Sequence, residues 1–269
     1  MHARIARPIL ALCTTTTTLS CSSSSSEPAP DRGTAACPAA EYSPAINPAD
    51  FSTTVDNPLY PLVLGTGYTF VDLDGTIGQT IVTPDTKDIL GVKTVVVHDY
   101  ATSPEGVLLE DTWDYFAQDK AGNVWYFGEE TKAYSGASTS TKGSWIGGID
   151  CAKPGIVMRA SPKIGDSYRQ EYLVGSAEDE ADVLALDETV AVKYGSFAHC
   201  LKTKDYTHLD PGNVENKYYC PGIGLVLTID LVTVGTPPRE ELTALNGMSS
   251  DGGTSTVDDA ETHDSDAHE

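Results

Sequence analysis

Apolar and polar residues alternate through most of the chain, and turn-forming residues interrupt the alternation at short intervals. VLLEDTWDYFAQD (residues 107–119) ends at Lys120-Ala121-Gly122-Asn123, and VWYFGEETKAY (residues 124–134) follows at once. A period of two with breaks every ~8–12 residues is typical of antiparallel hairpins. SAEDEADVLAL (residues 176–186) could form at most a couple of helical turns, but its β-branched continuation favours a strand. The sequence therefore predicts an all-β fold, an antiparallel meander forming a sandwich or a curved, partly open barrel.

Residues 56–245 carry this pattern without an internal linker and are predicted to form a single antiparallel β-domain, and the two ends differ from it in composition. Residues 1–20 combine two arginines with a short apolar stretch, which predicts a signal peptide. Leu19-Ser20-Cys21 approximates the cleavage box of bacterial lipoproteins, so Cys21 is the predicted lipid anchor. Residues 21–55, rich in Ser, Pro and Ala, predict a flexible tether. Residues 246–269 predict a disordered acidic tail.

The chain is strongly acidic, with 39 Asp and Glu against 17 Lys and Arg and a formal net charge of −22. Binding to a nucleic-acid backbone requires a basic surface, so we expect no nucleic-acid partner. Anionic membrane surfaces are disfavoured for the same reason, and we expect membrane contact only through the lipid anchor. The predicted location is outside the cytoplasm, either anchored to the bacterial cell envelope or, after simple cleavage, secreted.

Export permits disulfides, and four cysteines remain outside the signal peptide and the anchor. Cys200 and Cys220 flank Asp210-Pro211 symmetrically, and in a hairpin they would be cross-strand neighbours. Their bond is expected to stabilise the fold by roughly 2–4 kcal/mol. Cys37 and Cys151 form the remaining predicted pair. No Cys-x-x-Cys occurs and no histidine lies at ligand spacing, which disfavours a thiolate metal site.

Asp72-Leu73-Asp74-Gly75-Thr76 resembles the first motif of the haloacid-dehalogenase phosphatases. In that family the first Asp attacks phosphorus and the second serves as general acid, at the end of a parallel strand in an α/β fold. Here the following residues are β-patterned, and a second explanation is available. Asp-Gly is a preferred pair in tight hairpins, because both residues tolerate positive φ. We therefore predict a hairpin turn and name no catalytic residue.

Other candidate sites are weaker. Asp72 and Asp74 fail the spacing of an EF-hand loop, but a different calcium site at turns such as 119–123 or 210–215 remains open, and the metal content stays unknown. No Gly-x-Ser-x-Gly elbow indicates a serine hydrolase, no cofactor is expected, and the histidines are scattered. Several aromatic residues could line a cavity, although aromatic residues in strands more often form the core: Trp113, Trp125, Tyr126, Phe127 and Trp145.

Several phrases occur together in order, among them NPLYPLVLGTGYTF, DYFAQDKAGNVWYFGEETK and NKYYCPGIGLV. As a set, across roughly Asp56 to Leu242, the chain resembles a family of uncharacterised, secreted bacterial β-rich proteins, often lipoproteins. The resemblance implies export and an all-β domain, and it carries no catalytic residue.

Three functional hypotheses follow. The leading one is a non-enzymatic cell-envelope protein that displays a β-domain on a tether and binds a partner or an apolar ligand. A secreted hydrolase is the second, phosphatase-like through Asp72 and Asp74 or supported by calcium. A lipid-carrying half-barrel is the third.

Overall fold

The computed structural model describes Cys37, residues 41–233 and residues 235–247. Within these residues the fold is nearly all β, and the single short helix is the 3-10 turn η1 (Pro48–Asp50). The strands are β1 (Phe51–Ser52), β2 (Gly67–Val71), β3 (Ile77–Ile89), β4 (Val92–Thr102), β5 (Leu108–Asp119), β6 (Val124–Ser135), β7 (Ser138–Ser140), β8 (Trp145–Ile146), β9 (Lys153–Met158), β10 (Ser167–Arg169), β11 (Glu171–Tyr172), β12 (Asp179–Val192), β13 (Gly195–Thr207), β14 (Val214–Cys220), β15 (Gly224–Asp230) and β16 (Arg239–Asn246).

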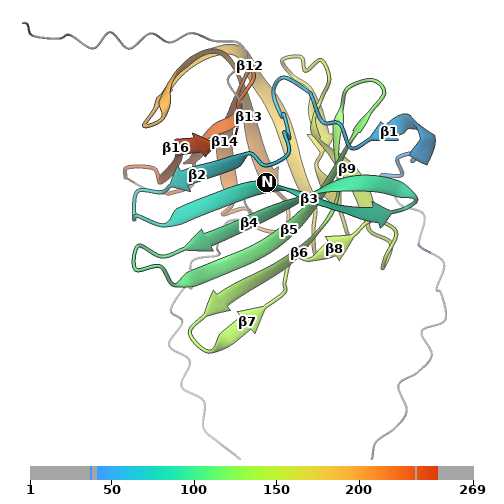
Figure 1. Cartoon of the computed structure of the whole chain (residues 1–269), viewed down its shortest axis with the longest axis horizontal. Coiled ribbons are helices and arrows are strands. Elements are labelled where there is room, and N and C mark those ends of the chain that lie inside the picture. Colours follow the sequence, from blue (N-terminus) through green and yellow to red (C-terminus); the bar gives the residue numbers. More distant parts are fainter. Residues whose placement is uncertain (1–36, 38–40, 234, 248–269) are drawn as a thin grey trace, which may run out of the picture.

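The strands form one curved antiparallel sheet that is nearly closed into a barrel (Figure 1). Their order is β10-β12-β13-β14-β15-β16-β2-β3-β4-β5-β6-β9-β11, so most neighbours are consecutive hairpins. The pairing of β16 with β2 joins the two ends of the meander across the longest separation in the chain. The all-β prediction is confirmed, and of its two alternatives the structure adopts the curved, partly open barrel. The segment 176–186 lies largely in β12, as its β-branched residues favoured.

One seam remains in the barrel, and a short bent segment spans it. β10 pairs with β12, whereas β11 pairs with β9, and Gln170 is the residue between them. The segment thus changes partners at Gln170, whose backbone nitrogen donates to the carbonyl of Asp179 at 2.8 Å. Gly155 of β9 lies directly against this bend, since a Cβ atom at Gly155 would fall 2.3 Å from the carbonyl carbon of Gln170. Only glycine fits there.

Apolar residues fill both the barrel interior and part of its outer face. Interior side chains include the fully buried Val82, Phe116, Tyr126 and Met158. On the outside, Phe127, Val92 and their neighbours form a separate cluster. The N-terminal segment covers this outer cluster, because Phe51 packs edge-on against Phe127, with ring centroids 5.3 Å apart.

Residues 41–55 are therefore part of the fold, although the sequence placed them in the tether. The Tyr42 hydroxyl donates to the carbonyl of Pro154 at 2.9 Å, and β1 pairs with β5. A few anchoring side chains suffice to fix a segment whose overall composition resembles a linker. The predicted signal peptide, Cys21 and most of the acidic tail lie outside the described residues.

Two disulfides join the four predicted cysteines. Cys200–Cys220 links β13 to β14 within their hairpin, with a Cα–Cα distance of 4.2 Å. Cys37–Cys151 spans 114 residues and ties the N-terminal segment to the loop before β9. The second bond helps to hold residues 41–55 against the domain, although their composition predicts a flexible tether.

The contact between Gly155 and Gln170 predicts that alanine at position 155 destabilises the fold more than alanine at an unobstructed glycine. Gly155→Ala should lower the free energy of unfolding by about 2–3 kcal/mol, because the added methyl group meets backbone atoms that cannot rotate away. Gly67→Ala in β2 is the matched control, since its Cβ would meet nothing within 4 Å and its φ is not positive; it should change stability by less than about 1 kcal/mol. Urea denaturation followed by tryptophan fluorescence measures both. Equal effects of the two substitutions would contradict the proposed closure.

Candidate functional site

The aspartates of the phosphatase-like motif belong to a hairpin turn, as predicted. β2 and β3 are antiparallel, and the turn closes through the Gly75 nitrogen, which donates to the Asp72 carbonyl at 3.1 Å. Gly75 alone takes a positive φ, +86°, so the left-handed position follows the Leu73-Asp74 centre of the turn. The Asp74 carboxylate accepts from the Thr76 nitrogen at 3.0 Å. The motif therefore has a local structural explanation in an antiparallel context.

The turn 119–123, a candidate for calcium, uses its carboxylate in the same way. Asp119 Oδ1 accepts from the nitrogens of Ala121 and Asn123, both at 2.9 Å. Its Oδ2 accepts from the side chains of Asn123 and Trp125, both at 2.8 Å. In the turn 210–215, Asp210 Oδ1 accepts from the Gly212 nitrogen at 3.0 Å. Within the described part of the chain, no three His, Cys, Asp or Glu side chains are grouped as metal ligands.

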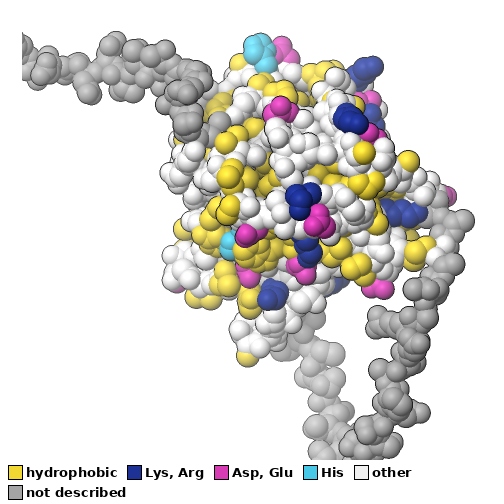
Figure 2. All heavy atoms as spheres, turned by 45° about the vertical axis from the view of Figure 1, so that its right-hand side comes forward, with side chains coloured by type: hydrophobic (Ala, Val, Ile, Leu, Met, Phe, Trp, Pro, Cys, Tyr) yellow, Lys and Arg dark blue, Asp and Glu magenta, His cyan; other side chains and the backbone are white. Residues whose placement is uncertain are grey.

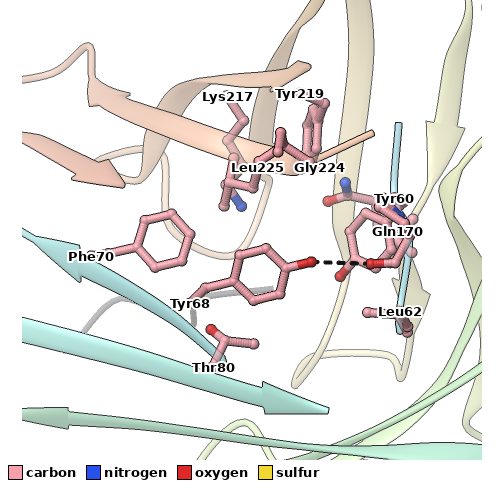
Figure 3. Close-up of a pocket in the computed structure, with 13 residues that line it drawn as sticks. Tyr60, Leu62, Tyr68, Phe70, Thr80, Gln170, Lys217, Tyr219, Gly224 and Leu225 are labelled. Atoms are coloured by element: carbon pink, nitrogen blue, oxygen red, sulfur yellow. Dashed lines mark hydrogen bonds between the residues drawn. The ribbon is translucent and has the colours of Figure 1, made fainter. Parts of the chain in front are cut away.

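A cavity of about 50 Å³ lies inside the barrel (Figure 3). Its wall combines residues of β2 and β15 with Val157 of β9. Four strands separate β9 from β2 in the sheet order, so the space lies between opposite walls. The segment before β2 covers part of it, and the Tyr68 hydroxyl donates to the Pro61 carbonyl at 3.4 Å. The lining is mostly apolar: Tyr60, Pro61, Leu62, Tyr68, Phe70, Thr80, Val157, Gln170, Lys217, Tyr219, Ile223, Gly224 and Leu225.

Lys217 brings a positive charge to this apolar wall, and it is almost completely buried. Its Nζ lies 3.4 Å from Asp205 Oδ2 and 3.7 Å from Glu215 Oε2. Burial by itself lowers the pKa of Lys217, but the carboxyl groups of Asp205, Glu215 and Asp179 outweigh it and hold the pKa above its usual value. The ammonium therefore stays charged at neutral pH. A buried charge of this kind persists only with such partners.

Asp205 is the centre of the polar network beside the cavity. Besides Lys217, it accepts from the Gln170 side-chain nitrogen at 3.1 Å and from the Thr203 hydroxyl. Gln170 is only 2% exposed, and its carbonyl oxygen Oε1 has no hydrogen-bond partner among the described residues. In Figure 3 Gln170 lies beside Tyr60, at the end of the cavity opposite Phe70. The cavity thus has one polar end and one aromatic end.

Further buried carboxyl groups continue from this network along the seam. Burial raises the pKa of Asp179 to about 6, an effect that Lys217 opposes and Asp205 increases. Burial also raises the pKa of Glu171 well above its usual range, and Asp179 adds to that rise. Trp145 Nε1 donates to Glu171 Oε2 at 2.8 Å. The pKa of Glu129 is also raised well above its usual range, mainly by burial and then by the negative charge of Glu171.

Charges of both signs are dispersed among apolar side chains on the face shown in Figure 2. Val63 and Leu64, in the turn that follows the cavity residue Leu62, are 45% and 63% exposed. Among the described residues, no helix is long and apolar enough to cross a membrane.

The aromatic residues that the sequence suggested for a cavity do not line this one. Tyr126 and Trp145 are buried in the barrel interior, whereas Phe127 is buried in the outer cluster, against which Trp113 and Trp125 pack. The lining aromatics are instead Tyr60, Tyr68, Phe70 and Tyr219.

Sequence analysis also missed Gln170 and Lys217. A usable signal existed for Lys217, because in VENKYYC the residues Glu215, Lys217 and Tyr219 alternate onto the buried face of β14. Gln170 carried no such signal, since its role follows from the bend at the seam.

No protein-family model and no curated protein matches the chain. Among solved structures, it is similar to one named a putative exported protein with YmcC-like fold from Bacteroides fragilis, at 15% identity, covering 70% of this chain and 98% of that chain with a TM-score of 0.42. It is also similar to one named a putative lipoprotein from Parabacteroides distasonis, at 12% identity, covering 70% and 97% with a TM-score of 0.36. Identities this low do not transfer a function.

The raised pKa of Asp179 predicts that mild acid favours the folded state. A carboxyl group whose pKa is higher in the folded than in the unfolded chain stabilises the fold at low pH, and this contribution is lost as pH rises through about 6. Asp179→Asn should therefore reduce the gain in stability between pH 7.5 and pH 5 by roughly 1–2 kcal/mol. Urea titrations at the two pH values measure the difference. Asp85→Asn, at an exposed position of β3, is the control and should leave the gain unchanged; a parallel loss in both variants would contradict the assignment.

Proposed function

We propose that the protein is a non-enzymatic, exported cell-envelope protein whose β-domain binds a small apolar ligand inside the barrel. The observation that carries the proposal is the internal cavity with a mostly apolar lining and a few buried polar groups at one end. Sites of this composition are typical of small-molecule binding, in which apolar contacts supply affinity and polar groups fix orientation. The Asp72 and Asp74 carboxylates serve their own turn, which favours binding over phosphoryl transfer.

The size of the cavity limits the ligand. A buried water requires about 10–15 Å³, so 50 Å³ holds roughly four water-sized groups. This matches a chain of about four to six carbon atoms, or the end of a longer molecule. Burial of six methylene-sized groups, the upper end of this range, at about 0.8 kcal/mol each gives at most roughly 5 kcal/mol, which corresponds to a Kd of about 0.3 mM or weaker. A short aliphatic compound is therefore a practical probe.

Export is supported by the two disulfides, which form and persist in oxidising compartments. The sequence of residues 1–21 adds a signal-peptide layout with Cys21 at the lipoprotein cleavage box. We propose that the mature chain is anchored through Cys21, with the β-domain displayed on the segment that precedes Cys37. Cys37 is a natural boundary, because its disulfide ties the chain to the domain at that point.

Substitutions at Leu225 test the cavity. Leu225→Trp should fill it and weaken the binding of 1-hexanol at least tenfold, because the indole takes the space of the ligand. Leu225→Ala should enlarge it and shift the preference toward 1-octanol. Leu184→Trp, at a 42% exposed position of β12, is the control and should bind as the unaltered protein does. Titrations followed by ¹H–¹⁵N correlation spectra measure Kd and locate the affected amides. Identical Kd values for all four proteins would contradict binding in the barrel.

Substitution of Cys21 tests the anchor. Cys21→Ser should move the protein from the membrane fraction to the soluble fraction and abolish incorporation of a labelled acyl chain. Globomycin, which inhibits processing of lipoprotein precursors, should cause the precursor of the unaltered protein to accumulate and should not affect the variant. Cys13→Ser, within the predicted signal peptide, is the matched control and should remain lipidated. If Cys21→Ser fractionates as the unaltered protein does, Cys21 is not the lipid anchor, and a secreted protein becomes the better description.

A further inference from the structure

The polar end of the cavity holds a buried acceptor without a partner, beside the paired ammonium of Lys217. The Gln170 side chain is buried, its Nε2 donates to Asp205 Oδ2 at 3.1 Å, and its Oε1 has no partner among the described residues. The bond to Asp205 fixes which atom of the amide is the oxygen, since a carboxylate accepts only from the nitrogen. A buried carbonyl without a donor is costly, so this position favours a ligand that brings an O–H or N–H group.

The charges around this acceptor disfavour an anionic ligand. Asp205 and Glu215 both lie near the single ammonium of Lys217, so the positive charge is already balanced. Thr80, on the opposite wall, donates its hydroxyl to the buried Asp99 at 3.1 Å and adds a third carboxyl group nearby. A carboxylate entering here would lose its hydration, and Lys217, the one cationic residue among the described lining residues, is already paired.

A cationic ligand is disfavoured for a different reason. Lys217 itself lines the cavity, and its ammonium is held close to Asp205. A second ammonium at Gln170 would compete for the same carboxylate and lie near a like charge. An uncharged donor avoids both costs.

The remaining walls determine how such a ligand would lie. Phe70 is at the end of the cavity opposite Gln170, and Leu225 lies on the side between them (Figure 3). A chain that donates to Gln170 Oε1 can therefore extend toward Phe70 along an apolar path. Apolar contact supplies most of the affinity, and the single donor sets direction and selectivity.

We propose that the cavity selects short aliphatic ligands with an uncharged hydrogen-bond donor, such as an alcohol or a primary amide, over carboxylates and amines of the same length. This inference rests on the proposed function, and it specifies the chemical class of the ligand. Gln170 is the residue that determines the selection.

The test compares four ligands of matched size: 1-hexanol, its isomer methyl pentyl ether, hexanoate and hexylammonium, at pH 7.5. 1-Hexanol should bind about three- to tenfold more tightly than the ether, which lacks a donor, as expected for one net hydrogen bond. It should bind at least tenfold more tightly than hexanoate or hexylammonium. Kd values come from the same spectral titrations, with the shifts of the Gln170 and Leu225 amides as reporters.

Gln170→Met removes the acceptor and keeps the length of the side chain. It should raise the Kd of 1-hexanol to about that of the ether and change the Kd of the ether by less than twofold. Gln170→Glu is the second variant: like Gln170→Met it deprives Asp205 of a donor, but it keeps an acceptor and adds a negative charge, so the difference between the two variants reports the acceptor. It should retain hexanol binding and weaken hexanoate further. The ligand comparison in the unaltered protein needs no variant, so the proposal stays testable if both variants unfold.

The outcomes separate the two proposals. If none of the four ligands shifts any cavity amide, the proposed function fails. If hexanol and the ether bind equally and Gln170→Met changes neither, binding in the barrel stands but the donor class is wrong, and Gln170 Oε1 meets only a water molecule. Tighter binding of hexanoate or hexylammonium than of hexanol would also overturn the inference, in favour of a charged ligand.

Discussion

The close approach of Gly155 to the backbone of Gln170 is the constraint on which the closed part of the barrel depends. A β-sheet that curves into a barrel must bring its first and last strands together, and here those strands, β10 and β11, follow each other in the chain at the bend of Gln170. No side chain fits between the bend and β9. The same bend directs the Gln170 amide to Asp205 and the cavity, and it places Glu171 against Trp145. The bend at Gln170 therefore both closes the barrel and positions the polar end of the cavity.

The polar interior has a cost that the apolar core must offset. Lys217 and the buried carboxyl groups lose their hydration, and replacement of such groups by apolar residues is often neutral or stabilising. Their retention is thus poorly explained by stability. The proposed ligand site gives a reason for it, because the network around Asp205 holds the Gln170 amide in one direction. The raised pKa of Asp179 is a consequence of the same crowding.

The sequence pattern predicted those parts of the fold that depend on residues close together in the chain. The Asp72–Thr76 turn, the strand character of β12 and the hairpin that contains Cys200 and Cys220 depend on residues close in sequence, and all were recognisable. Docking of residues 41–55 was not, because Tyr42 and Phe51 anchor a segment whose composition is otherwise that of a linker. The cavity was not predictable either. It requires the walls β2, β9 and β15 to face each other, and their relative placement follows from sheet closure rather than from any local signal.

The segment before β2 decides between a small ligand and a whole lipid. A cavity of 50 Å³ is far below the roughly 300–1,000 Å³ of sites for larger ligands, so a complete acyl chain requires this segment to leave the barrel. Several contacts hold it in place. The Asn57 side chain donates to the carbonyls of Gly122 and Arg159, and the Pro58 carbonyl accepts from the Gly222 nitrogen at 2.7 Å. Release would break bonds that are formed with three separate loops, and it would expose Tyr60. A fold built to carry lipids would keep that space open, so the geometry favours a short ligand, or the tip of a long one, over a lipid cargo.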